Sequence, residues 1–210
     1  MLRIALTKGR IETKTIDLLE RAGYDVSELR DKGRKLILRV GNSDMEVVLA
    51  KSADVITYVQ HGVCDLGVVG KDTIMENGGE FYELLDLGFG GCHFALAGPE
   101  GKDFYAGYTQ KTVATKYPLV TKQYFSEKSI DVQVVKIDGS VELAPLLGLA
   151  DAIVDIVETG ATLKENGLVI YEKIAAISAR LIVNAAAVKL KKEEIDGFLK
   201  QIRIEKCGVN

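Results

Sequence analysis

The sequence predicts an α/β protein made of two lobes. Short apolar runs typical of buried strands alternate with segments of helical periodicity along the 210 residues, which predicts largely parallel sheets. A short motif also recurs once in each half of the chain. The length suits one large domain or two small ones, and the 47% apolar and 27% charged residues are typical of a globular protein.

The elements expected in the first half each have a local signal. The segment 11–22 has helical periodicity and stops before Gly23, a common residue after a helix end. Turn residues at 41–43 separate two strands, and the glycines at 78–79 end a helix. In order, we expect strand 3–6, helix 11–22, strands 36–40 and 47–49, helix 54–60, strand 66–69, helix 71–77, and strands 84–87 and 93–97.

The second half continues the alternation of strands and helices. In order, we expect strand 112–114, helix 119–126, strand 132–137, helix 141–147, strand 152–157, short helix 161–165, strands 169–174 and 181–188, and helix 191–202. The boundaries between the lobes are expected near 88–92 and near 177–180. The chain would then form lobe I from 1–90 and 180–210 and lobe II from 91–179.

The recurring motif is a glycine, an aspartate three residues later, and then a buried strand. It occurs as GVCDLGVVG at 62–70 and as GLADAIVDI at 148–156. Glycine and aspartate are common before strands. The motif therefore supports two similar lobes only together with the alternation of strands and helices.

Charge is unevenly distributed along this acidic chain. Residues 1–40 hold ten Lys and Arg against six Asp and Glu, a net charge of +4, whereas the whole chain has −3. A local basic region fits a small polyanionic ligand, or alternatively a solvated face. An acidic protein is not expected to bind nucleic acid broadly.

The sequence contains no signal for membrane insertion or secretion. It has no run of about 18 uncharged apolar residues, which a membrane span needs, and charge appears too early for a signal peptide. Three distant cysteines, Cys64, Cys92 and Cys207, fit reduced thiols. We therefore expect a cytoplasmic protein that does not bind membranes.

The most informative segment is DAIVDIVETGATL at 151–163. A buried strand leads into Thr159-Gly160-Ala161-Thr162, a turn of small residues whose backbone N–H groups and hydroxyls can bind a phosphate. Asp155 and Glu158 come just before the turn, where carboxylates can accept hydrogen bonds from sugar hydroxyls. The pattern fits a ribose-5-phosphate site. Alternatively, Thr159 only caps a helix.

Three further segments carry charge at strand or loop ends. Thr7-Lys8-Gly9-Arg10 follows the first strand, where ligands of α/β sheets bind, although it can also be a surface turn. Arg34 lies in a basic loop at 30–35 that, by itself, is more typical of a solvated face. Lys71 and Asp72 follow the strand at 66–69, and Asp72 can simply be an acid favoured in the first turn of a helix.

These segments together resemble the ATP phosphoribosyltransferase family over essentially the whole chain. The supporting motifs are ALTKGR at 5–10, GVCDLGVVGKD at 62–72, ATKYP at 114–118, GSVELAPLLGLADAIVDIVETGATL at 139–163 and ARLIVN at 179–184. The family has a long form with a C-terminal regulatory domain and a short form without it. This chain resembles the short form.

The resemblance implies a reaction, a fold and a partner. The reaction is ATP + phosphoribosyl pyrophosphate → N1-(5-phosphoribosyl)-ATP + pyrophosphate with substrate-bound Mg²⁺, the first step of histidine biosynthesis. The implied fold is a two-lobe, periplasmic-binding-protein-like (type II) fold with a cleft between the lobes. The implied partner is a regulatory subunit similar to histidyl-tRNA synthetase, in a hetero-oligomer that contains a dimer of catalytic subunits.

The resemblance also implies roles for individual residues. The turn at 159–162 would bind the 5-phosphate, and Lys71 and Asp72 would line the ATP side. The residues expected at the ribose are Asp155, Glu142, Glu158 and Asp151. The residues expected at the pyrophosphate and the ATP phosphates are Lys8, Arg10 and Arg34.

Two other functions stay open from the sequence. A solute-binding module could share a two-lobe fold, since fold does not fix function. A salvage phosphoribosyltransferase that acts on a free base could share the Thr-Gly-x-Thr turn. Release of pyrophosphate from ATP and phosphoribosyl pyrophosphate would distinguish the three possibilities.

Overall fold

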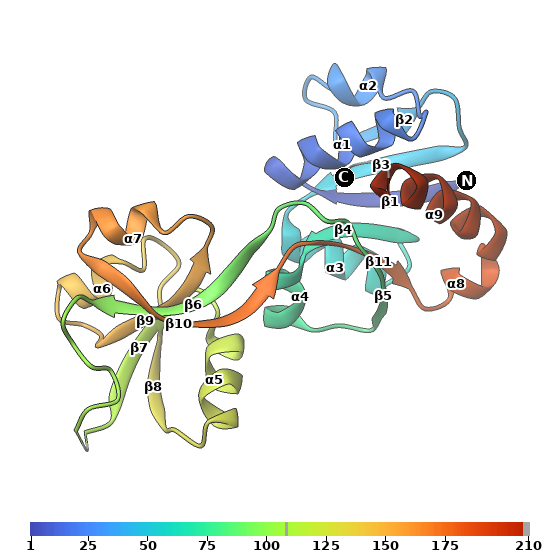
Figure 1. Cartoon of the computed structure of the whole chain (residues 1–210). Helices are drawn as coiled ribbons and strands as arrows, with labels where there is room; N and C mark the ends of the chain where they lie inside the picture. Colours follow the sequence, from blue (N-terminus) through green and yellow to red (C-terminus); the bar gives the residue numbers. More distant parts are fainter. Residues whose placement is uncertain (108, 208–210) are drawn as a thin grey trace. The chain divides into compact units, whose positions relative to one another are not determined.

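The computed structural model describes residues 1–107 and 109–207, with side chains up to residue 204. The chain forms two units, each described here by itself (Figure 1). The first unit combines Met1–Gly90 with Ser178–Asn210, and the second is Gly91–Ile177. The chain therefore leaves the first unit once and returns to it.

The first unit contains a mixed sheet in the order β2-β3-β1-β4-β11-β5. Its faces are covered by different helices, because side chains alternate along a strand. Ile4 and Leu6 pack with apolar residues of α1 and α9, whereas Ala5 packs with residues of α3. The elements are β1 (Leu2–Thr7), α1 (Arg10–Arg21), α2 (Ser27–Arg30), β2 (Ile37–Val40), β3 (Met45–Ala50), α3 (Ser52–Gln60), β4 (Leu66–Gly70), α4 (Lys71–Asn77), β5 (Phe81–Asp86), β11 (Ala179–Asn184), α8 (Ala187–Leu190) and α9 (Lys192–Cys207).

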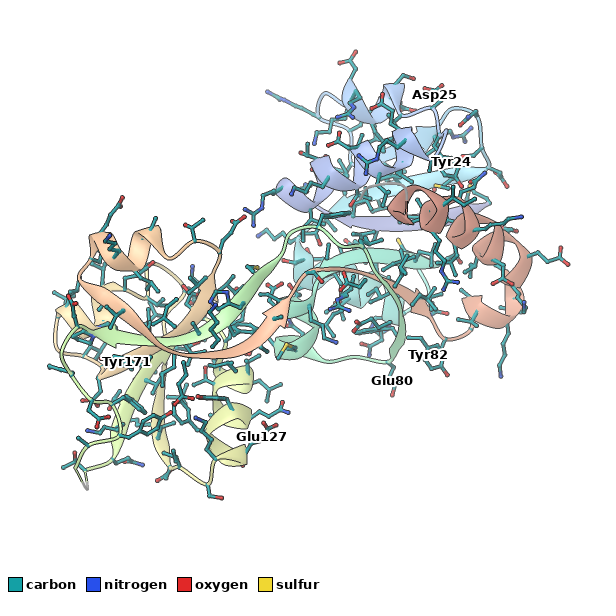
Figure 2. All side chains as sticks on the ribbon, viewed as in Figure 1. Tyr24, Asp25, Glu80, Tyr82, Glu127 and Tyr171 are labelled. Atoms are coloured by element: carbon teal, nitrogen blue, oxygen red, sulfur yellow. The ribbon has the colours of Figure 1, made fainter. Side chains whose placement is uncertain are left out.

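The second unit contains a sheet in the order β10-β6-β9-β7-β8. Tyr171 joins the outer pair, because its hydroxyl donates a hydrogen bond to the carbonyl of Pro99 at 2.7 Å and its ring lies over Gly98 (Figure 2). The elements are β6 (Cys92–Pro99), β7 (Lys111–Thr115), α5 (Pro118–Glu127), β8 (Val132–Lys136), α6 (Leu143–Leu146), β9 (Ala152–Val157), α7 (Ala161–Glu165) and β10 (Leu168–Ile177).

The expectation of largely parallel sheets is wrong. The pairs β1–β3, β1–β4, β7–β8 and β7–β9 are parallel, whereas β2–β3, β4–β11, β5–β11, β6–β9 and β6–β10 are antiparallel. The reason is the route of the chain. The strand that enters the second unit (β6) and the strand that re-enters the first (β11) run opposite to the parallel strands beside them, and β2 is antiparallel to β3, the strand that follows it.

Two short helices differ from the expected elements. Helix α2 lies in a segment that we did not expect to be helical. The strand expected at 181–188 ends at Asn184, and α8 follows it. The Oδ1 atom of Asn184 accepts the N–H groups of Ala186 at 2.9 Å and Ala187 at 3.0 Å, which pairs backbone donors at the start of the new helix. Apolar content alone does not distinguish such a turn from a strand.

The recurring motif has the same structure in both units. The carboxylate of Asp65 accepts the N–H of Arg3 at 2.8 Å, and the N–H of Asp65 donates to the carbonyl of Arg3 at 2.8 Å. Asp151 makes the same two bonds with Thr112, also at 2.8 Å each. Each aspartate thus fixes the start of one parallel strand against its neighbour, β4 against β1 and β9 against β7.

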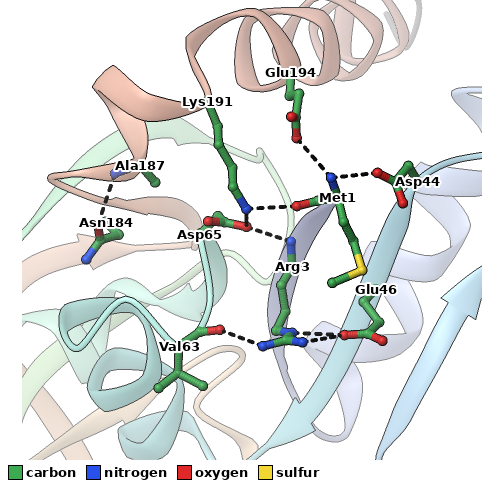
Figure 3. Close-up of polar contacts among 10 residues, drawn as sticks. All are labelled: Met1, Arg3, Asp44, Glu46, Val63, Asp65, Asn184, Ala187, Lys191 and Glu194. Atoms are coloured by element: carbon green, nitrogen blue, oxygen red, sulfur yellow. Dashed lines mark hydrogen bonds and ion pairs between the residues drawn. The ribbon is translucent and has the colours of Figure 1, made fainter.

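A polar cluster joins the start of α9 to the first strand (Figure 3). Lys191 donates to the carboxylate of Asp65 and to the carbonyl of Met1, both at 2.8 Å (Figure 3). The terminal amine of Met1 lies 2.6 Å from Asp44 and 3.7 Å from Glu194. These contacts bind the segment after β11 to the first unit, at the opposite end of β4 from Lys71.

The remaining sequence features concern membranes and cysteines. Within the described residues, no helix is both long and apolar enough to cross a membrane. Cys64 and Cys92 are not joined in a disulfide, and the side chain of Cys207 lies outside the described residues.

Gly67 on β4 tests the packing of the first unit. A Cβ there would lie 2.7 Å from Val59 and 2.8 Å from Val55, both on α3. We expect Gly67→Ala to lower the free energy of unfolding by about 1–3 kcal/mol through overpacking, measured by urea denaturation. The control is Gly197→Ala in α9, which contacts no atom within 4 Å and should be neutral or stabilising by up to about 1 kcal/mol. Equal effects of the two substitutions would contradict this packing.

Candidate active site

The carboxyl end of β9 opens into a cavity of about 250 Å³ in the second unit. Its wall combines the strand, the turn that follows and the start of α7. The lining residues are Ala95, Ala97, Glu142, Ile153, Asp155, Ile156, Val157, Glu158, Thr159, Gly160, Ala161, Thr162 and Leu163. The structure therefore brings together seven of the eight residues that were expected at the ribose and the 5-phosphate; Asp151 is the exception.

The turn is shaped by glycine and by short-range hydrogen bonds. Gly160 has φ 77° and ψ 4°, in the left-handed region that favours glycine. Thr159 Oγ1 accepts the N–H of Ala161 at 3.4 Å. At the other end of α7, the amide of Asn166 donates to the carbonyl of Thr162 at 2.8 Å. These bonds fix the backbone while the hydroxyl of Thr162 takes no part in them.

Backbone N–H groups are the donors that this turn can offer. The first residues of a helix have no carbonyl partner one turn earlier, and the N–H of Lys164 is the first that reaches back, to Gly160 at 3.1 Å. Helix α7 has only five residues. The dipole of so short a helix is small, so individual N–H groups and threonine hydroxyls account for its capacity to bind an anion.

Asp155 is a half-buried carboxylate in the cavity wall. Burial raises its pKa above the ordinary value, and the nearby carboxylate of Glu142 acts in the same direction. The N–H of Ile156, which donates to Asp155 at 2.8 Å, and the charge of Lys116 oppose this shift in pKa. The site thus holds a carboxylate in a position where its charge is costly, a common feature of functional sites.

Lys116 was missed from the sequence. It is exposed and follows Thr115, which pairs with Val154 next to Asp155. The sequence contains a signal for Lys116, because this residue belongs to the ATKYP segment and directly follows an expected strand. The missing information was that this strand lies beside β9.

Asp151 does not belong to this site, contrary to expectation. It precedes β9 and does not line the cavity, whose wall begins at Ile153 and continues into the turn after the strand. Its carboxylate is bonded to the backbone of Thr112. Asp151 is therefore a structural residue. An extended strand rises about 3.3 Å per residue, which separates Asp151 from Asp155.

In the first unit, Lys8 and Arg10 lie at the carboxyl end of β1 and are exposed. The N–H of Lys8 donates to the carbonyl of Ala50 at the end of β3, at 2.9 Å. Between the two cations, Gly9 has φ 98° and ψ −139°, a conformation that side chains disfavour. The glycine therefore makes the turn from strand to helix possible.

The segment that carries Arg34 reaches the same edge of the first sheet. The N–H of Leu49, near the end of β3, donates to the carbonyl of Leu36 at 2.8 Å. Lys32 forms an ion pair with Glu12 in the first turn of α1. The predicted cations Lys8, Arg10 and Arg34 thus lie in neighbouring loops of one unit.

Lys71 and Asp72 follow β4 at this edge, and both have partners within the unit. The ammonium of Lys71 lies 2.6 Å from Glu83, which also binds Arg180 at 3.0 Å. Burial raises the pKa of Asp72, whose carboxylate accepts the hydroxyl of Thr73 at 3.3 Å. Their assignment to ATP stays a prediction.

Comparison with known proteins identifies the family. The family model described as "HisG: ATP phosphoribosyltransferase" matches residues 51–204. The chain belongs to the ATP phosphoribosyltransferase family. Members of this family are pentosyltransferases that transfer a phosphoribosyl group to ATP, the first step of histidine biosynthesis.

Individual relatives agree with this membership. The chain is 58% identical to an ATP phosphoribosyltransferase of Clostridium kluyveri over 204 residues, covering 97% of this chain and 93% of that protein. It is 54% identical to one of Clostridium acetobutylicum over 202 residues, covering 96% and 94%.

Solved structures support the two-lobe type II fold expected for the family. A chain of the ATP phosphoribosyl transferase (HisG:HisZ) complex from Thermotoga maritima matches with a TM-score of 0.84 and 34% identity, covering 98% of both chains. The periplasmic aliphatic sulphonate binding protein SsuA from Escherichia coli matches with a TM-score of 0.61 and 14% identity, covering 98% of this chain and 72% of that chain. The second likeness concerns the fold alone.

Asp155 links stability to pH in this ATP phosphoribosyltransferase. The pKa of Asp155 is higher in the folded than in the unfolded state. Above the folded pKa, the ionised carboxylate therefore lowers the stability of the fold. Below the unfolded pKa, the carboxyl group is protonated in both states and this loss of stability is absent. We expect Asp155→Asn to raise the thermal midpoint at pH 7.5, by a few degrees if the cost is about 1 kcal/mol.

Thermal denaturation at several pH values measures this effect. The gain from Asp155→Asn should shrink as the pH falls toward the ordinary carboxyl range, because the wild-type carboxylate becomes protonated. Glu165→Gln, on the exposed side of α7, is the control and should leave the midpoint unchanged. A lower midpoint for Asp155→Asn at pH 7.5 would contradict the argument.

Proposed function

We propose that this ATP phosphoribosyltransferase binds the 5-phosphate of phosphoribosyl pyrophosphate in the turn at 159–162. Glu142, Asp155 and Glu158 contact the ribose hydroxyls. Lys8, Arg10 and Arg34 bind the pyrophosphate and the ATP phosphates, and Lys71 and Asp72 line the ATP side. The observation that supports this proposal best is the cavity in which a strand ending in carboxylates meets the Thr-Gly-Ala-Thr turn.

The proposed roles follow the charge changes of the reaction. The lone pair of adenine N1 forms the new bond to the anomeric carbon of the ribose. The carbon–oxygen bond to pyrophosphate breaks, and its electron pair goes to the pyrophosphate oxygen. The guanidinium groups of Arg10 and Arg34 stabilise this charge through charge-assisted hydrogen bonds. Adenine N1 is already nucleophilic, so positioning replaces a general base.

The carboxylates of the cavity fit a substrate-bound Mg²⁺. Among the described residues, no group of three or more His, Cys, Asp or Glu side chains could hold a metal by itself. Mg²⁺ is commonly bound through one or two carboxylates together with substrate phosphates, and Glu142 and Asp155 supply such oxygens. When bound, the ion would neutralise part of the phosphate charge.

We further infer a regulatory partner and a cytoplasmic location. The related chain from Thermotoga maritima was solved as a HisG:HisZ complex. This chain is then a catalytic subunit that works with a regulatory subunit resembling histidyl-tRNA synthetase, in a hetero-oligomer containing a dimer of catalytic subunits. The cytoplasm supplies both substrates.

A pyrophosphate-release assay tests the activity directly. ATP, phosphoribosyl pyrophosphate and Mg²⁺ are mixed with the full chain, with and without the regulatory subunit. Release that requires both substrates supports the proposal. A solute-binding module would release none, and a salvage enzyme would require a free base in place of ATP.

Thr162 tests the phosphate turn. We expect Thr162→Val to weaken binding of phosphoribosyl pyrophosphate by about 3- to 10-fold through loss of one hydrogen bond, and to leave the affinity for ATP unchanged. Calorimetry of each ligand measures the two affinities. Thr57→Val, on the exposed side of α3, is the control. Equal losses for both ligands would remove Thr162 from the phosphate site.

Arg10 and Arg34 test stabilisation of the leaving group. We expect Arg10→Ala and Arg34→Ala to lower kcat by about 100-fold while each KM changes less, because pyrophosphate gains its charge in the transition state. Steady-state kinetics measure both parameters, and Arg21→Ala at the end of α1 is the control. Wild-type turnover in either variant would exclude that residue from the role.

A further inference from the structure

Glu12 is a buried carboxylate in the first turn of α1 that the proposed function does not use. Only 4% of its surface is exposed. One carboxylate oxygen, Oε2, accepts the N–H of Gly9 at 3.2 Å, and the other, Oε1, forms an ion pair with Lys32. Its two oxygens therefore contact two different loops.

Each of these loops carries one of the proposed catalytic arginines. Gly9 directly precedes Arg10 at the start of α1. Lys32 begins a turn in which the N–H of Lys35 donates to the carbonyl of Lys32 at 3.0 Å. Arg34 lies at the centre of that turn, after Gly33 with φ 52°. The contacts of Glu12 thus fix the residue before Arg10 and the residue that begins the turn of Arg34.

We propose that Glu12 is a positioning residue that holds the Arg10 turn and the Arg34 turn at a fixed spacing for the pyrophosphate group. The inference rests on the proposed role of the two arginines. Two guanidinium groups on separate exposed loops repel each other, and each loop would lose conformational entropy when pyrophosphate bound. The Glu12 carboxylate contacts both turns. Part of the conformational entropy of the two loops is therefore lost when the protein folds, before the ligand binds.

A buried carboxylate needs compensation, and this one receives it from both loops. A carboxylate loses solvation when buried unless it is paired and hydrogen-bonded. The Lys32 side chain is 39% exposed, whereas that of Glu12 is 5% exposed, so the lysine covers the acid from the solvent side. If Lys32 moved away, the buried carboxylate of Glu12 would lose its ion pair. The energetic cost of this loss opposes movement of the Arg34 turn.

Four variants of the full chain test this proposal. Glu12→Gln and Lys32→Met should each lower kcat by about tenfold, because displaced groups at a reacting centre lose rate steeply. The KM values should stay within about twofold. Lys32→Arg preserves the ion pair and should retain wild-type kcat. In Glu12→Gln/Lys32→Met, the loss should equal that of one single variant, because both act through one contact.

Binding of inorganic pyrophosphate, measured by calorimetry, provides a second measurement. Its affinity should fall in Glu12→Gln and Lys32→Met and remain unchanged in Lys32→Arg. Glu20→Gln is the matched control, since Glu20 lies on the same helix and pairs with Arg30 at 2.7 Å, outside the two turns. Unchanged kcat and pyrophosphate affinity in Lys32→Met, or losses that multiply in the double variant, would overturn the proposal. If Glu12→Gln fails to fold, the comparison of Lys32→Met with Lys32→Arg decides.

The arginine variants separate this inference from the proposed function. If Arg10→Ala and Arg34→Ala keep wild-type turnover, the proposed catalytic role fails, and the role of Glu12 fails with it. If they lose turnover while Lys32→Met keeps both turnover and pyrophosphate affinity, only the inference about Glu12 fails.

Discussion

Asp65 and Asp151 each exchange two hydrogen bonds with the strand beside them, and these bonds fix the register of the parallel strands in each unit. Register determines which residues reach the carboxyl edge of a sheet, because a shift of one residue reverses every side chain. The cations after β1 and the carboxylates of β9 both lie at such an edge. The two aspartates therefore position functional loops from the opposite ends of β4 and β9.

In contrast to the contacts of these two aspartates, the functional loops contain features that lower the stability of the fold. Gly160 and Gly9 adopt backbone conformations that other residues disfavour, and Asp155 keeps its carboxylate in a half-buried wall. Such features lower stability, and the surrounding fold must compensate for them. The apolar faces of the sheets and the aspartate contacts provide that compensation. Stability and catalysis thus depend on different ends of the same strands.

The predictions from sequence agree with the geometry where the signal is local. The turn at 159–162 and Asp155 come from one segment of the sequence, and together with Glu142 they line one cavity; their roles in binding stay predictions. Lys116 was missed and Asp151 was misplaced, because both depend on which strand lies beside β9 and at which end. The mixed direction of the sheets was missed for the same reason. Pairing between distant strands leaves no mark in local periodicity.

The position of β11 has a consequence for synthesis on the ribosome. This strand pairs with both β4 and β5, yet it follows the entire second unit in the chain. Until β11 emerges, β4 has an open edge and β5 lacks its neighbour, whereas the second unit is continuous in sequence. In the nascent chain, the apolar strand β4 therefore has an unpaired edge until β11 is synthesised, and such an edge is prone to aggregation. Completion of the first sheet therefore depends on synthesis of β11.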